Sequence, residues 1–522
     1  MMTVRLLILS LLLVACSPRP EEQRLGNGVL LITVDGWRQD HLGAFGAPFA
    51  TTPWLSAEAP DAIFFTNAWA HDGDPVVSHA SILSGSESMF CLVPEIALDD
   101  GTVIKPVYTT AMPDRLPRLA RRFLAGGWAT AAFLDNPRLS SLRGLTTGFH
   151  DVIPLDGSLS MDGSLSMEGE SDAHGIEPTH ERLVRWLDQL PADRNWFAWV
   201  HVADLTRIFD DKDLPMDEAF LRGPDDAWTP PTGIRWPSFH SVATQNQSDP
   251  ARTLGQGLAV YDTALARLDT GLGAMIQDVR SRMDPEETTI ALAGSTGLSF
   301  GEAGGYFSST GLSSHDLAVP LVLWPRKASG IDVGRTMDGL VGLADLGPTL
   351  LEIHGSDPPG PDGMTGLSLA SHLRNPGRPA PRAGPEQREN IYPWDQLHGG
   401  FGGQVPVLLT SSLMGGHGFV SDTMFFMDAG SKPALLRALT GIPGRPPNAA
   451  AWVFVEERAS GRTWRAARSD ITELPEGMPG RFDDHFGPES PVGSLLEQRR
   501  TRLHGLETLS SGRLEGPVIQ EP

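Results

Sequence analysis

The sequence predicts an α/β fold with a large, mostly parallel mixed sheet between helix layers and a smaller C-terminal α+β subdomain. Three observations lead to this expectation. Short apolar runs alternate with helical patterns along the chain, most of these runs end at a polar residue, and 522 residues exceed the length of one small domain. An apolar content of 40% is sufficient for a sizeable core.

The first expected strand, Val29 to Val34, is a mostly apolar run without polar alternation, typical of a strand buried on both faces of a parallel sheet. Asp35 follows it directly. Because ligand sites in open α/β sheets lie at the carboxyl ends of strands, Asp35 is well placed for chemistry. Further strands are expected at Ala129–Leu134, Trp196–Val202, Thr288–Ala293 and Val319–Trp324, and helices at Leu116–Ala125, Thr179–Leu190, Leu254–Met283 and Gly339–His354.

The N-terminus has the features of an export signal. Arg5 precedes an apolar run, Leu6 to Val14, that is too short to span a bilayer and is typical of a signal peptide. Leu13-Val14-Ala15-Cys16 matches the lipobox of bacterial lipoproteins, in which the cysteine becomes the lipid-bearing N-terminus; the alternative is an ordinary signal peptide with a chance cysteine. We therefore expect an exported protein that is lipid-anchored at Cys16, at the outer membrane, its periplasmic face or the cell surface.

Composition and charge divide the remaining chain and exclude some partners. We expect a signal peptide at residues 1–16, a tether at 17–28, the α/β domain at 29–385, the C-terminal subdomain at 386–509 and a tail at 510–522. A formal charge of −23 opposes binding to nucleic acid. Asp156–Met161 is repeated as Asp162–Met167, which predicts a solvent loop without a function of its own. The second cysteine, Cys91, lies in an apolar context that predicts a buried thiol.

Several blocks, in order along the chain, resemble bacterial sulfatases of the alkaline-phosphatase superfamily. Val29 to Ala70 is similar to the opening of these enzymes, with Val34-Asp35, Arg38, Asp40–Gly43, Thr52-Pro53 and Phe65–Ala68 at the family's spacing. The later blocks are Ser78–Gly85, Asn136-Pro137, Trp199–His201 with Asp204, Phe300–Glu302, Val319–Leu321 and Asp345–Leu350. Ordered agreement from Val29 to Leu373 is more specific than any single motif.

The resemblance implies a hydrolytic site, and this sequence departs from it. The family uses a nucleophile at the start of a helix, bound to a divalent metal held mostly by carboxylates. The nucleophile position falls on Pro75, which has no side-chain heteroatom, and the late metal-binding pair falls on Ser295 and Thr296. Family histidines fall on Thr206, Ala303 and Ser308. Asp35 is the only family metal ligand that is retained.

Two functions follow from this departure. The first is a degenerate pseudo-sulfatase that binds an unknown ligand or protein partner, with no cofactor expected. The alternative is an active sulfuric- or phosphoric-ester hydrolase with a rearranged site and one divalent metal, Ca²⁺ or Zn²⁺. In that case Ser78, His79 and His201 are the candidates for catalysis, and Asp74 and Asp204 are the candidates to join Asp35 as metal ligands.

Overall fold

The computed structural model describes the regions of the chain that build the core. These are residues 25–87, 96–97, 103–104, 112, 116–136, 139, 144–154, 174–207, 217–220, 250–300, 306–308, 314–356, 364–377, 381, 407–411, 416–420, 424–428, 452–457 and 462–467. The predicted signal peptide, Cys16, Cys91, Ala303, the tandem repeat and the predicted domain boundary near residue 385 lie outside them. Within these ranges, the helices lack the length and hydrophobicity needed to cross a bilayer.

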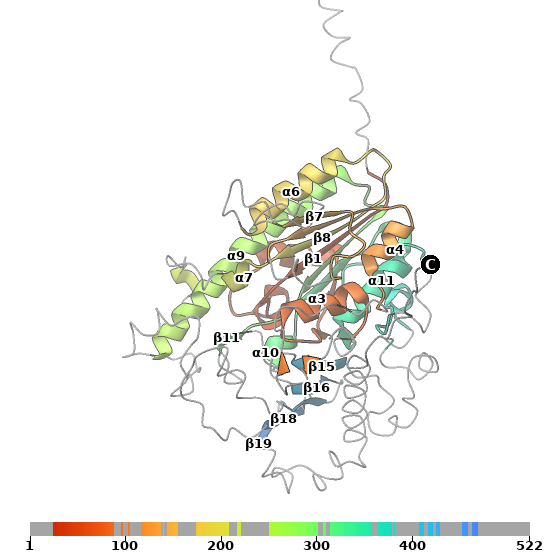
Figure 1. Cartoon of the computed structure of the whole chain (residues 1–522). Helices are drawn as coiled ribbons and strands as arrows, with labels where there is room; N and C mark the ends of the chain where they lie inside the picture. The colour runs from red at the N-terminus through yellow and green to blue at the C-terminus, as the bar shows by residue number, and fades with distance from the viewer. Residues whose placement is uncertain are drawn as a thin grey trace, which may run out of the picture.

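An eight-stranded sheet forms the centre of the fold (Figure 1). Its strands, in spatial order, are β13 (Arg335–Met337), β2 (Ile63–Phe65), β12 (Leu321–Trp324), β9 (Thr288–Gly294), β1 (Gly28–Val34), β8 (Trp196–Val202), β6 (Ala129–Leu134) and β7 (Asp151–Pro154). Every neighbouring pair is parallel except those of β12, which runs antiparallel to β9 and β2. The predicted mostly parallel mixed sheet is therefore confirmed.

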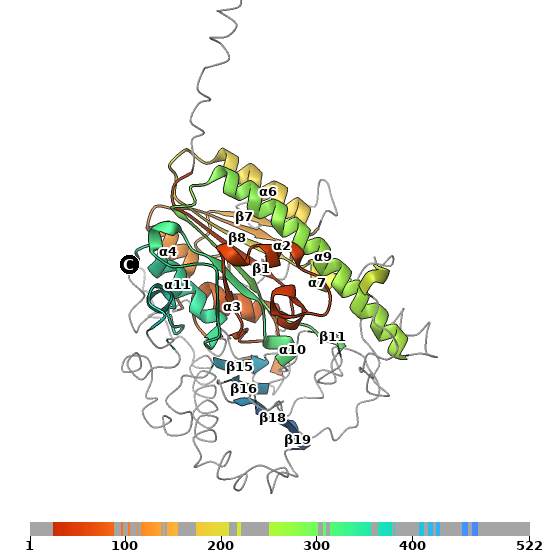
Figure 2. The ribbon, with the colours of Figure 1, turned by 180° about the vertical axis from the view of Figure 1, so that it is seen from behind.

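Helices cover both faces of this sheet, and Figures 1 and 2 show the two layers from opposite sides. One layer contains α2 (Pro53–Ala57), α6 (Ile176–Gln189) and α9 (Pro250–Arg282); the other contains α3 (Pro75–Ser84), α4 (Leu119–Ala125), α11 (Leu346–Ile353) and α12 (Ala370–Arg374). The strand β1 packs against both layers, because successive side chains of a strand point to opposite faces of the sheet. Leu30 and Ile32 lie in the core beneath α6 and α9, and Val29 and Leu31 lie in the core beneath α3 and α4. This double burial explains why its sequence lacks polar alternation.

The spacing of the apolar residues explains where the helices form and which face of each is buried. In α6 the buried residues recur on one face, at Ile176, Thr179, Leu183, Trp186 and Leu187. In α3 all ten residues are buried, so this helix has no solvent face. Hydroxyls inside such a helix need local acceptors, and Ser84 Oγ donates to the Ala80 carbonyl at 2.6 Å.

One predicted helix is wrong in its first part. The expected helix at Gly339–His354 begins only at Leu346, because Val341 and Gly342 form the short strand β14 (Val341–Gly342), which pairs with β3 (Ala68–Trp69). Asp345 then closes the turn η7 (Leu343–Asp345) by accepting the Gly342 N–H at 2.9 Å. Strand pairing across the sequence has overridden the local helical pattern here.

Further short elements complete the described chain. They are η1 (Gln39–His41), η2 (Gly43–Phe45), η3 (Ala59–Asp61), β4 (Ile96–Ala97), β5 (Val103–Ile104), α7 (Asp204–Arg207), η5 (Glu218–Phe220), β10 (Ser299–Phe300), β11 (Tyr306–Ser308), α10 (Ser314–Leu317) and η6 (Lys327–Ser329). A separate antiparallel sheet contains β15 (Val407–Ser411), β16 (Gly416–Val420), β17 (Met424–Asp428), β18 (Trp452–Glu457) and β19 (Arg462–Ala467). It lies within the chain segment assigned to the C-terminal subdomain.

Candidate active site

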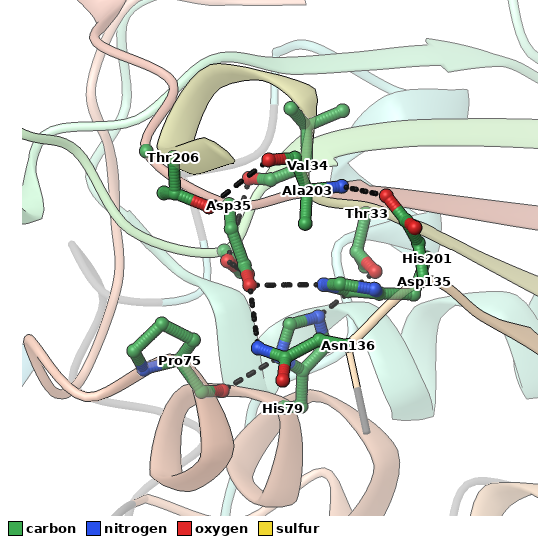
Figure 3. A network of polar contacts seen from close by, with 12 residues as sticks. Thr33, Val34, Asp35, Pro75, His79, Asp135, Asn136, His201, Ala203 and Thr206 are labelled. Carbon is green, nitrogen blue, oxygen red and sulfur yellow. Dashed lines mark hydrogen bonds and ion pairs between the residues drawn. The ribbon is translucent and has the colours of Figure 1, made fainter. Parts of the chain in front are cut away.

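The carboxyl ends of four neighbouring strands bring polar side chains together around Asp35 (Figure 3). Asp35 directly follows β1 and is only 1% exposed. Ser295, which follows β9, donates its hydroxyl to Oδ1 of Asp35. His201 on β8 places Nε2 3.0 Å from Oδ2, and Asn136 after β6 donates from Nδ2 to the same oxygen at 3.4 Å. Both carboxylate oxygens are therefore engaged by protein groups.

The surroundings of Asp35 keep its carboxyl group ionised. Burial acts to raise the pKa of Asp35, since a charge is poorly solvated inside the protein. The positive field of His201 and the hydrogen bond from Ser295 outweigh burial and hold that pKa well below its usual range. A buried carboxylate of this kind depends on its partners, because removal of a partner would leave an uncompensated charge.

His79 lies on α3, one turn after Pro75, with both ring nitrogens engaged. Its Nδ1 lies 2.6 Å from the Pro75 carbonyl, which can only accept, so Nδ1 carries the hydrogen. Its Nε2 lies 2.9 Å from Thr33 Oγ1, which itself accepts the Trp199 indole N–H at 2.9 Å and donates to the ring. Burial lowers the pKa of His79 to about 4, so the imidazole is neutral at pH 7.

Pro75, to which the sequence analysis assigned the nucleophile position, lies at the start of α3. Pro75 is the first residue of α3, where a helix tolerates proline because the N–H there has no intrahelical partner. Asp74 precedes it as the N-cap, and its carboxylate accepts the Val76 N–H at 2.9 Å. The fallback nucleophile Ser78 is fully buried and donates its hydroxyl to the Ser295 carbonyl at 2.6 Å. Asp74 and Ser78 thus have structural hydrogen bonds of their own.

Ser295 and Thr296 hold the ends of β1 and β9 together. In addition to its bond to Asp35, Ser295 donates its N–H to the Val34 carbonyl at 2.8 Å. Thr296 Oγ1 accepts the Gly36 N–H at 3.3 Å. Gly36 has a φ of +76°, and a Cβ there would lie 2.8 Å from Cγ2 of Thr206. A second aspartate after Asp35 would therefore be both strained and obstructed.

The donor set does not fit a hard divalent cation. Asp35, His79 and His201 are buried, and one ligand atom from each lies within 4.8 Å of the others. This group has one carboxylate, whereas hard cations such as Ca²⁺ need several oxygen ligands. Asp35 is already bonded to Ser295, and both His79 nitrogens are engaged. Among the described residues, Asp74 and Asp204 do not join this converging group.

Asp204 instead belongs to a neighbouring network at the ends of β6 and β8. Its Oδ1 accepts the Ile176 N–H at the start of α6, at 3.3 Å. Burial and the nearby Asp135 carboxylate raise the pKa of Asp204 to about 7. Asp135 accepts the Ala203 N–H at 2.9 Å and lies 3.6 Å from Arg207. These contacts join α6 and α7 to the sheet.

Two residues of the site carried no role in the sequence analysis. Asn136 was recognised only as part of a matching block, although its place after an apolar strand was a usable signal. Thr33 stands inside an apolar run and carries no sequence signal, yet it orients His79. Two other positions were matched to family histidines. Ser308 lies in β11, and the Thr206 side chain lies next to Gly36, in the space that a Cβ there would need.

Comparisons with known proteins identify the family and the fold. Residues 27–356 match the sulfatase family. Among solved structures, the phosphonate monoester hydrolase of Agrobacterium radiobacter superposes with a TM-score of 0.57 at 17% identity, over 92% of this chain and 96% of that one. The phosphonate monoester hydrolase of Silicibacter pomeroyi gives 0.52 at 17% identity, over 92% and 95%.

A third structure was solved with its substrate D-glucosamine-2-N,6-O-disulfate and gives a TM-score of 0.54 at 14% identity, over 93% of this chain and 97% of that one. At such identities the likeness establishes the fold. Among curated proteins, no sequence matches this chain. The match over residues 27–356, together with the shared fold, shows that the chain belongs to the sulfatase family.

Proposed function

We propose that this protein is a sulfatase-family member that no longer hydrolyses esters and instead binds a ligand or protein partner at the cell envelope. The observation that carries the proposal is the pyrrolidine ring of Pro75 at the helix start where the family places its nucleophile. Catalysis by this fold requires an atom there that can attack the ester. Proline offers none, and the Ser78 hydroxyl is committed to the Ser295 carbonyl.

The proposal also holds that the site has lost the metal ion on which hydrolysis depends. Ester hydrolysis on this fold relies on a cation to neutralise the charge that develops on the ester oxygens. Here the hydroxyl of Ser295 and the ring of His201 occupy the oxygens of Asp35. The strand ends therefore satisfy one another, and the former reaction centre serves as a structural junction.

A hydrolysis assay tests the loss of catalysis. The purified protein is incubated with 4-nitrophenyl sulfate, 4-nitrophenyl phosphate and a phenylphosphonate monoester, each with Ca²⁺, Mn²⁺ or Zn²⁺. We expect release of 4-nitrophenol at the same background rate from the native protein and from D35N. Turnover by the native protein that D35N abolishes would refute the proposal.

One observation favours a second candidate, a hydrolase with a rearranged metal site. The ligand atoms of Asp35, His79 and His201 converge, and two imidazoles with one carboxylate are a donor set that Zn²⁺ accepts. Binding would require His79 to exchange its bond with Thr33 for one to the ion. This candidate predicts zinc-dependent turnover that is lost in both D35N and H201N and retained in the surface variant H180N.

The location is proposed from the N-terminal sequence. Cys16 in the lipobox would carry the lipid, and several acyl chains anchor a protein firmly where a single chain does not. The chain has one other cysteine, Cys91, which supplies a matched control. We expect C16S to abolish labelling by radioactive palmitate and to move the protein out of the membrane fraction, while C91S leaves both unchanged. Equal labelling of C16S and native protein would contradict the anchor.

A further inference from the structure

A hollow of about 580 Å³ lies at the sheet edge, and the residues around Asp35 are not among those that line it. Thr66, directly after β2, and Thr336, within β13, line one side of it, and Asp40 and Phe45, in the turns after β1, line another. Its volume is in the range of small-molecule sites. Open α/β sheets bind ligands outside the carboxyl ends of their strands, which is where Thr66 lies. We call this feature the edge hollow.

The charges of the edge hollow are balanced within the protein. Among the described residues that line it, Asp40 is the only carboxylate, and lysine and arginine are absent. The buried Arg38 pairs with both oxygens of Asp40, with Nε 2.8 Å from Oδ1 and a terminal nitrogen 2.5 Å from Oδ2. A sulfate or phosphate group would therefore meet no unpaired cation and a nearby carboxylate. The edge hollow favours a ligand without a formal charge.

The remaining lining offers hydrogen bonds beside a small apolar surface. Gln39, Ser314 and His315 add an amide, a hydroxyl and an imidazole to the two threonines. Gln39 is fixed in place, because its Nε2 donates to the backbone carbonyls of Phe65 and Val319 at 3.3 and 3.1 Å. Both amide hydrogens are thereby used, so Gln39 can offer a ligand its Oε1 as an acceptor, and a fixed group loses less conformational entropy when it binds.

The apolar part of the lining comes from the turn η2. Phe45 packs edge-on against Phe64, with ring centroids 6.1 Å apart, and Ala44 lies exposed beside it. The Asp40 side chain is 55% exposed, and each carboxylate oxygen has a second lone pair that can accept from a hydroxyl. Polar groups on several sides of an aromatic ring suit a molecule with many hydroxyls and an apolar C–H face.

We propose that the edge hollow binds a neutral, polyhydroxylated ligand about the size of a disaccharide, which makes it a sugar site separate from the family's reaction centre. The inference deepens the proposed binding role and rests on it. The hydroxyls of the sugar would bond to Asp40, Gln39 and the threonines, and its C–H face would lie on Phe45. The absence of lysine and arginine from the lining predicts discrimination against sulfated sugars.

Saturation-transfer NMR and calorimetry on the full-length protein test this site. The probes are glucose, galactose, N-acetylglucosamine, lactose and chitobiose, with glucosamine 6-sulfate as the charged comparison. The variant A44W fills the edge hollow from an exposed position, and A125W places the same side chain at the exposed end of α4 as a matched control. Thermal unfolding verifies that both variants are folded.

We expect at least one neutral probe to bind with a dissociation constant of about 1 mM, weakened about tenfold or more by A44W and unchanged by A125W. Three outcomes would overturn the proposal: no neutral probe bound at about 10 mM, equal binding by A44W and native protein, or tighter binding of the sulfated sugar. Ester hydrolysis would refute only the proposed loss of catalysis, so the two failures are distinguishable.

Discussion

Replacement of Asp35 by asparagine tests how the strand ends are held together. D35N keeps the shape of the side chain and removes its charge. In the native protein the carboxylate accepts the Ser295 hydroxyl and the Asn136 amide and faces His201 at 3.0 Å. After the exchange, His201 no longer faces a carboxylate, and one position that accepted hydrogen bonds carries the Nδ2 donor instead.

The magnitude follows from burial. Asp35 is 1% exposed and His201 is fully buried, so water cannot replace the lost partner. Removal of one member of a buried ion pair costs about 3–5 kcal/mol, and the hydrogen bond from Ser295 lies within that figure because neighbouring contacts do not add independently. We therefore expect D35N to lower the free energy of unfolding of the main domain by about 3–5 kcal/mol at pH 7.

Urea unfolding followed by tryptophan fluorescence measures this change. D278N is the matched control, because Asp278 also faces a histidine, His180, at 2.9 Å but with its side chain 52% exposed. An exposed pair contributes about 0–1 kcal/mol. The reasoning is refuted if D35N and D278N destabilise the protein equally, or if chelators destabilise the native protein as much as D35N does.

Three further predictions follow from the same contacts. Burial lowers the pKa of His354 to about 3, so below pH ~6.5 the unfolded chain takes up a proton that the folded protein does not. The free energy of unfolding should therefore decrease as the pH drops below this value, and H354Q should show a shallower decrease in urea titrations between pH 7 and 5. Burial and Asp135 raise the pKa of Asp204 to about 7, so the folded state binds a proton between pH ~4 and this value. Stability is therefore lost as the pH rises through this range, and D204N, which keeps an acceptor for the Ile176 N–H, should stabilise the protein at pH 8 by about 1–2 kcal/mol and leave it unchanged at pH 5. Equal effects of D204N at both pH values would contradict this. The double variant S295D/T296H places a second carboxylate beside Asp35 and should unfold at a lower temperature than native protein without metal, with recovery in Mn²⁺ or Ca²⁺ that native protein does not show.

Much of the fold could be predicted from the sequence because the central strands are buried on both faces. Their apolar runs, such as Thr288 to Ala293, differ clearly from the amphipathic helices between them. The short outer strands β2, β7 and β13 escaped prediction, since three or four residues carry no periodicity. β14 was mistaken for the start of a helix, because its pairing with β3 depends on residues far away in the chain.

For the site, the sequence predicted where residues lie in the helices and strands better than it predicted their hydrogen-bond partners. Pro75 at the helix start and Asp35 at the end of β1 lie where the block order placed them. The partners of Asp35 could not be inferred, since Asn136 is 101 residues away and its approach depends on the order of strands in the sheet. Sequence alone also left Asp74 and Ser78 as candidates for chemistry, and only their hydrogen bonds in the structure assign them to capping and packing.

Metal analysis of the purified protein shows directly whether the strand ends around Asp35 hold a cation. The full-length protein is exchanged into metal-free buffer after incubation with Ca²⁺, Mn²⁺ and Zn²⁺, and each ion is quantified by mass spectrometry beside D35N. The account predicts that neither protein retains an equivalent of any ion, because Ser295 and His201 already occupy the oxygens of Asp35. One equivalent retained by native protein and lost in D35N would contradict it.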